Sequence, residues 1–88
     1  MLTKVVELAI VPPYGIKVRF SNGQRGTHDC SKLVLEAGPT IELLRDPKFF
    51  ARAFLEFGAP TWPNGFDMSP EWLRREMLAA GELSASAA

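Results

Sequence analysis

The feature that most constrains the fold is a short alternating segment followed by a turn dipeptide. Apolar and polar side chains alternate strictly over residues 16–21, in the order Ile-Lys-Val-Arg-Phe-Ser. A period of two residues is typical of a strand with one buried face. Asn22-Gly23 follows, and this pair favours a type I′ turn, which needs positive φ at both central residues. We therefore predict a β-hairpin in which residues 16–21 pair antiparallel with residues 24–28.

The segment before this hairpin reads as another strand. Residues 2–11 alternate with apolar side chains on both faces, so the strand is expected to be covered on both sides. Pro12-Pro13 ends it, because proline has no N–H to donate to a β-ladder. The connection over residues 12–15 is short, and it should place this strand beside residues 16–20.

The second half contains another alternating segment and a loop with a restricted backbone. Residues 51–57 read as a strand, and residues 61–62 read as a short return strand. Residues 61–70, Thr-Trp-Pro-Asn-Gly-Phe-Asp-Met-Ser-Pro, hold two prolines and an Asn-Gly turn. Ser69 is expected to cap a helix that has Pro70 in its first position and ends at Gly81.

Shorter helices are predicted in the middle of the chain. Asp29 or Ser31 can cap a helix over residues 32–37 that Gly38-Pro39 ends. Residues 40–44 fit either a short strand or irregular chain. Asp46-Pro47 predicts a single helical turn over residues 48–50.

Together these elements predict an α+β domain. We expect an antiparallel sheet of about four to five strands, with the short helix and the C-terminal helix packed on one face. Residues 1–81 are expected to form a single domain, and residues 82–88 a disordered tail.

Composition excludes several classes of protein. With 47% hydrophobic and 23% charged residues, the 88-residue chain is typical of a globular domain. Ten basic and ten acidic residues give zero formal net charge, which argues against a general nucleic-acid binder. Lys17, Arg19 and Arg25 fit a solvated strand face, because three charges neutralise too few phosphates for strong binding.

The same composition bears on location. No apolar run approaches the roughly 20 residues of a membrane helix, and the N-terminus does not resemble a signal peptide. The single cysteine, Cys30, cannot form an internal disulfide, so a reducing cytoplasm is expected.

No constellation of residues predicts catalysis. His28, Asp29 and Cys30 are consecutive, and neighbours in a strand point to opposite faces, so they cannot converge on one ion. Neither a second histidine nor a second cysteine is present to complete a zinc site. We predict no catalytic residue, no cofactor and no metal.

The polar residues of the 61–70 loop have two interpretations. In the structural one, Asn64 turns the chain, while Asp67 and Ser69 accept hydrogen bonds from the free N–H groups of the helix start. In the functional one, Asp67 lies in a ligand or partner pocket beside Trp62. Aromatic residues are also frequent here, and Phe54 and Trp72 are candidates for an exposed interface patch. The candidate partner or ligand surface therefore comprises Phe54, Trp62, Asn64, Asp67 and Trp72.

The order of several motifs resembles a known bacterial family. These motifs are Phe20-Ser-Asn-Gly23, Asp29, Leu44-Arg-Asp-Pro47 with Phe49 or Phe50, and Trp62-Pro-Asn-Gly65 with Asp67 and Pro70. Over residues 2–78 the chain resembles the domain of unknown function 2442. The resemblance implies a compact α+β domain without an established biochemical activity. Some relatives carry a helix-turn-helix domain after this module, for which this sequence has no room, and others look like the smaller partner of a toxin-like protein.

These observations lead to three functional hypotheses. The first is a non-catalytic protein-interaction module, antitoxin-like or adaptor-like, that binds another small protein or forms a homodimer. The second is a part of a DNA-binding regulator system, although the chain by itself is not expected to bind nucleic acid. The third is a small-ligand-binding domain centred on the Trp-Pro-Asn-Gly loop.

Overall fold

The computed structural model describes residues 3–84, and it confirms the α+β class. The strands are β1 (Val5–Val11), β2 (Gly15–Phe20), β3 (Arg25–Asp29), β4 (Phe54–Glu56), β5 (Ala59–Thr61) and β6 (Leu83–Ser84). The helices are the 3₁₀ turn η1 (Leu33–Leu35), α1 (Pro39–Leu44), α2 (Pro47–Phe50) and α3 (Pro70–Ala79). None of these helices is long and apolar enough to span a membrane.

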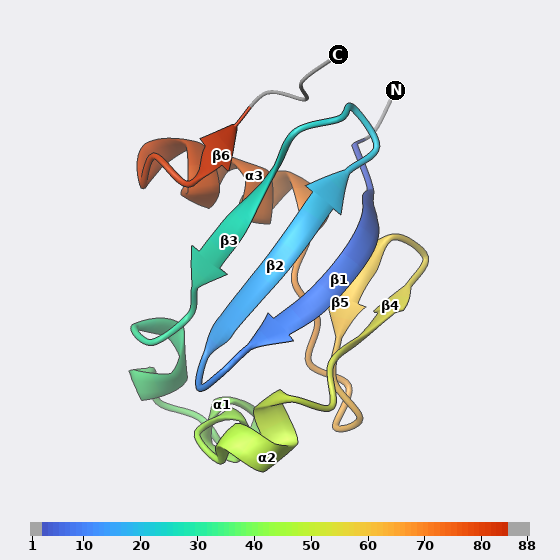
Figure 1. The fold of residues 1–88 in the computed structure, drawn as a ribbon. Coiled ribbons are helices and arrows are strands. Elements are labelled where there is room, and N and C mark those ends of the chain that lie inside the picture. Colours follow the sequence, from blue (N-terminus) through green and yellow to red (C-terminus); the bar gives the residue numbers. More distant parts are fainter. Residues whose placement is uncertain (1–2, 85–88) are drawn as a thin grey trace.

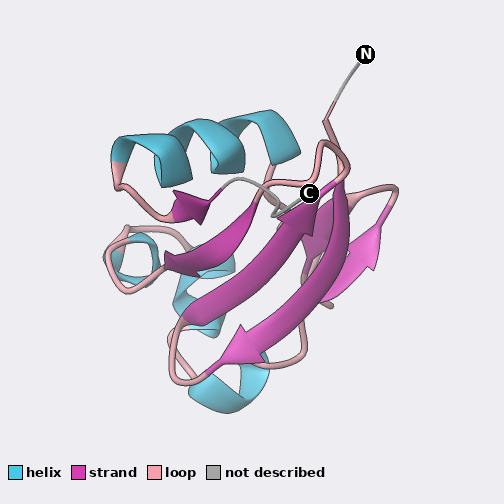
Figure 2. Cartoon of the chain, turned by 45° about the horizontal axis from the view of Figure 1, so that its top comes forward, coloured by secondary structure: helices cyan, strands magenta, loops and turns pink. Residues whose placement is uncertain are grey.

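The strands form two antiparallel sheets. Four of them lie in the order β1-β2-β3-β6, and β4 pairs with β5 in a separate two-stranded sheet. The predicted pairing of the first strand with the second and the first hairpin are confirmed. The second hairpin also forms, but its strands are residues 54–56 and 59–61 instead of 51–57 and 61–62, because residues 51–52 form the turn that follows α2. The helices gather on one side of the larger sheet and leave its other face, here called the outer face, uncovered (Figures 1 and 2).

The core lies between the larger sheet and the helices. Ile16, Val18 and Phe20 of β2 are fully or almost fully buried, as the alternation predicts. Leu73 and Met77 of α3 face them from the helical side and are also fully buried. The rest of the buried apolar cluster is Val5, Cys30, Val34, Leu44, Phe50, Trp62 and Met68.

A β-bulge in β1 changes the face on which its side chains lie. Val5 pairs with Phe20 and Glu7 pairs with Arg19, so Val6 is an extra residue. Val5 is buried, whereas Val6 remains 43% exposed. Strict alternation predicted Val5 opposite Leu8, but the bulge returns Leu8 to the side of the core.

The first hairpin uses a different turn from the one predicted. In this hairpin, the Gly23 N–H donates to the Phe20 carbonyl, and only Gly23 of the turn has positive φ, at 92°. This is a three-residue loop closed by a left-handed glycine, so the predicted type I′ turn is wrong here. Positive φ at two successive residues occurs instead at Phe57 (51°) and Gly58 (79°), between β4 and β5.

The helix starts agree with the predicted caps. The Asp46 carboxylate accepts from the Lys48 N–H, and the Ser69 hydroxyl accepts from the Trp72 N–H. Residues 32–37 give only the turn η1, and Gly38-Pro39, expected to end a helix, instead begins α1. Residues 40–44, expected to be strand or irregular, are therefore helical.

The C-terminal segment also differs from the prediction. Residues 82–88 were expected to be a disordered tail, but Leu83–Ser84 pair with β3 as β6. The Glu82 carboxylate lies 2.6 Å from His28 Nδ1 and also accepts from the Asp29 N–H. Residues 85–88 lie outside the described residues.

Candidate functional site

Trp62, the first candidate site residue, belongs to the core. Its side chain is 1% exposed, and its indole Nε1–H donates to the Phe50 carbonyl at 2.9 Å. Its ring packs against those of Phe50 and Phe66, with centroid separations of 5.4 and 5.6 Å. A partner or ligand could reach Trp62 only by displacing these contacts, so its role is structural.

Asn64 ties the loop to α1. Its Oδ1 accepts from the Phe66 N–H at 3.2 Å, and its Nδ2 donates to the Thr40 carbonyl at 3.0 Å. The turn-forming interpretation of Asn64 is therefore supported. The Thr40 contact adds a long-range link that no local pattern predicted.

Asp67 behaves differently from both interpretations. Its backbone bridges to Thr61, but its exposed side chain makes no hydrogen bond within residues 3–84. The expected contact with the start of α3 is made by Ser69 alone. Trp62 and Asn64 are thus held by contacts within the fold, whereas the Asp67 side chain is exposed.

This difference between neighbouring residues gives a testable prediction. Asn64→Ala removes two hydrogen bonds and is expected to lower the free energy of unfolding by about 1–2 kcal/mol. Asp67→Ala removes none and is expected to change it by less than about 0.5 kcal/mol. Urea denaturation followed by circular dichroism measures both values. An equal decrease in the free energy of unfolding in the two variants would contradict the structural role of Asn64 and the absence of such a role for Asp67.

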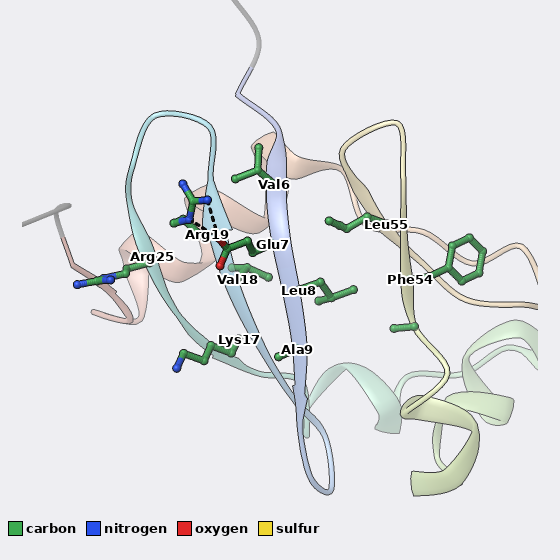
Figure 3. Close-up of a pocket in the computed structure, with 11 residues that line it drawn as sticks. Val6, Glu7, Leu8, Ala9, Lys17, Val18, Arg19, Arg25, Phe54 and Leu55 are labelled. Carbon is green, nitrogen blue, oxygen red and sulfur yellow. Dashed lines mark hydrogen bonds and ion pairs between the residues drawn. The ribbon is translucent and has the colours of Figure 1, made fainter.

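Trp72 and Phe54, the two aromatic candidates, lie on separate surfaces. Trp72 is half-buried on α3, and its ring meets the edge of the His28 ring at a centroid separation of 6.3 Å. Trp72 and His28 line an open groove of about 600 Å³ between η1 and α3. Phe54 is 43% exposed, and its ring points to the opposite side of β4 from Leu55 (Figure 3). The candidate residues therefore do not form one continuous site.

A larger open groove runs along β1, and we call it the β1 groove. Its volume is about 760 Å³. Residues of β1 and β2, with Arg25 of β3, line it on one side, and residues 53–55, which include the candidate residue Phe54, line it on the other. Figure 3 shows Leu8 of β1 and Leu55 of β4 on one side of the β1 ribbon, with Leu55 reaching toward β1. Val6, Lys17, Arg19 and Arg25 lie on the other side of the ribbon. Basic and apolar side chains thus meet in a single groove.

Charge in the β1 groove is predominantly positive. Arg19 Nε donates to Glu7 Oε1 at 3.0 Å, and this ion pair is the only one that involves a groove residue within the described chain. The Arg19 hydrogen bond and charge lower the pKa of Glu7, and Arg25 and Lys17 add to the same effect. Lys17 and Arg25 have no carboxylate partner of their own among residues 3–84.

The histidine in β3 and the cysteine that follows this strand are both buried. Cys30 is fully buried, and burial, with Asp29 and Glu82 adding, raises the pKa of its thiol to about 12. The thiol is therefore neutral near pH 7 and a poor nucleophile. Within residues 3–84, no three His, Cys, Asp or Glu side chains are grouped so as to hold a metal ion.

The fold and its surface define a small α+β domain with an antiparallel sheet that helices cover on one face. The model of a family described as a protein of unknown function (DUF2442) matches residues 5–78. The chain belongs to this family, as the motif order indicated. Neither a curated protein nor a solved structure matches the chain.

The sequence interpretation named one residue that lines the β1 groove, Phe54, but did not predict the groove. It identified Lys17, Arg19 and Arg25 as an exposed strand face, which the structure confirms. It had no signal for the exposure of Val6, because that depends on the bulge. It also did not predict that β4 would lie across β1 and complete the second wall.

Proposed function

We propose that this chain is a non-catalytic protein-interaction domain and that its partner binds in the β1 groove. The observation that carries this proposal is the free edge of β1 beside an apolar and basic groove. The family resemblance further supports an antitoxin-like or adaptor role in the bacterial cytoplasm.

The free edge arises from the strand order. β1 is the first strand of the larger sheet, so among the described strands only β2 pairs with it. The Val5 N–H donates to the Gly58 carbonyl at 2.8 Å, and this contact covers only the beginning of the edge. An unpaired edge presents backbone N–H and C=O groups that readily accept another strand. Exposed Val6 adds apolar surface at the same place.

The roles of the loop residues support an interaction domain over a small-ligand site. Trp62 and Asn64, the core of the small-ligand hypothesis, are both used in contacts within the fold. Removing those contacts to bind a ligand would cost packing and hydrogen bonds. The β1 groove needs no such displacement.

Site-specific photo-crosslinking tests the proposal. Benzoylphenylalanine replaces Val6 in the groove or, as a matched control, Leu43 on α1, which is 50% exposed and does not line the groove. Both variants are irradiated in a lysate of the source organism. We expect a discrete protein adduct from position 6 that is absent from position 43, identified by mass spectrometry.

Each outcome bears on the proposal. An adduct at position 6 with another protein, or with a second copy of the chain, supports it. Equal adducts from the two positions, no adduct, or an adduct that nuclease removes would contradict it. The last result would favour the nucleic-acid hypothesis.

A further inference from the structure

We infer that the occupant of the β1 groove is an extended, acidic segment of a different protein, in which carboxylates alternate with apolar side chains. This inference rests on the proposed function, because it names the chemistry of the partner at the same surface. Three features of the groove support this occupant: the position of the cations, the apolar wall and the strand edge.

The cations are clustered by the strand register. In the register of the sheet, Arg19 of β2 lies directly opposite Arg25 of β3. Lys17 lies two residues before Arg19 in β2 and on the same face. The lining of the groove holds these three basic side chains and one acidic side chain, Glu7. Since the whole chain has zero formal net charge, positive charge is concentrated here. An acidic partner would match this distribution.

One carboxylate already shows how such a partner can be held. Glu7 Oε1 accepts hydrogen bonds from Arg19 Nε and from Arg19 Nη2. Lys17 and Arg25 remain without a carboxylate in the described chain, so two similar positions are open. The lowered pKa of Glu7 agrees with a surface that favours the ionised form.

The shape of the groove favours an extended segment. β1 provides a seven-residue strand whose edge beyond Val5 has no hydrogen-bonded strand partner among the described residues, and β4 lies beside that edge. Leu8 and Leu55 form an apolar wall on one side of β1, and Val6 lies with the cations on the other side (Figure 3). Alternate side chains of an added strand point to opposite faces, so its acidic residues can lie on the basic side while its apolar residues contact this wall.

Charge disfavours two other occupants. A symmetric pair of copies that meets through this groove would bring two sets of three cations together, and like charges disfavour such an interface. Nucleic acid would find only two cations that are not already paired, and phosphate binding gains affinity with each charge neutralised.

A display library of short random peptides, selected against the full chain, tests the inference. Wild type is compared with Lys17→Gln/Arg25→Gln and with the control Lys48→Gln/Arg75→Gln, whose exposed cations lie outside the groove. The two double variants change the net charge equally. Thermal melts confirm that all three proteins are folded before selection.

We expect wild type and the control to enrich peptides in which Asp or Glu alternates with apolar residues. The groove variant should lose this preference and bind the selected peptides about tenfold more weakly. Enriched peptides without acidic residues, equal binding by the two double variants, or no enrichment would overturn the inference.

The two proposals can fail separately. A position-6 adduct with another protein, combined with peptides that lack acidic residues, would overturn only the acidic-segment inference. A position-6 adduct with a second copy would do the same. Failure of the crosslinking experiment itself would remove the interaction function.

Discussion

Trp62→Ala is expected to lower the free energy of unfolding by about 3–5 kcal/mol, the range for large aromatic truncations in cores. The indole is 1% exposed and packs against Phe50 and Phe66, so its removal leaves a cavity between α2 and the loop. The variant also loses the hydrogen bond from Nε1 to the Phe50 carbonyl. Urea denaturation followed by circular dichroism gives the difference from wild type.

Two further variants separate the causes of this loss. Trp62→Phe keeps an aromatic ring but removes the Nε1–H donor, and it should lie between wild type and Trp62→Ala. Leu35→Ala, at a side chain that is 75% exposed, should change stability by less than about 0.5 kcal/mol. If Trp62→Ala cost no more than Leu35→Ala, Trp62 would have to be reassigned from the core to the surface.

Gly26→Ala is expected to lower the free energy of unfolding by about 1–3 kcal/mol, the range for overpacking of a close contact. A Cβ atom at Gly26 would overlap the Glu82 carbonyl oxygen and come within 3.2 Å of Met77 Cε. The methionine side chain can move, but the Glu82 backbone leads directly into β6, which pairs with β3, and the Glu82 side chain contacts His28. The substitution should therefore displace the C-terminal segment, which hydrogen exchange at Leu83 and Ser84 would detect.

A chain shortened to end at Gly81 tests the origin of that cost. Without Glu82 the backbone clash disappears, so Gly26→Ala should destabilise the shortened chain much less than the full chain. Thr27→Ala, on the exposed side of the same strand, serves as the control in both backgrounds. Equal costs of Gly26→Ala in the two chains would contradict the proposed clash with Glu82.

Helix starts were predictable because their chemistry is local. Asp46 and Ser69 each accept a hydrogen bond from an N–H two or three residues later, and proline follows each of them. The strand alternation of β2 was equally clear, because β2 has one core-facing and one solvent-facing side. These features need only a few neighbouring residues.

Features that depend on distant contacts were not predictable in the same way. Residues 40–44 form α1 although their sequence also fits other structures, and Asn64 contacts the Thr40 carbonyl across the fold. Leu83–Ser84 become a strand only because β3 offers them an edge. A short polar segment carries no signal of such a neighbour.

The candidate site shows the same division. The type of each residue in the 61–70 loop indicated turn and capping chemistry, and the structure places Asn64 and Ser69 in these roles. Whether Trp62 faced the core or the solvent could not be read from its neighbours, because an aromatic residue suits both positions. The β1 groove could not be predicted from the sequence, because its walls come from strands that are far apart in the sequence.

Sequence pattern alone thus established the α+β class, the first hairpin and the helix caps of this DUF2442 domain. These features could be predicted because alternation, turn residues and caps depend on the side chains and hydrogen bonds of residues that are neighbours in the sequence. The bulge at Val6, the strand β6 and the β1 groove arose from packing. Each of them depends on contacts between backbone groups and side chains that are distant in the sequence, and local conformational preferences do not specify these contacts.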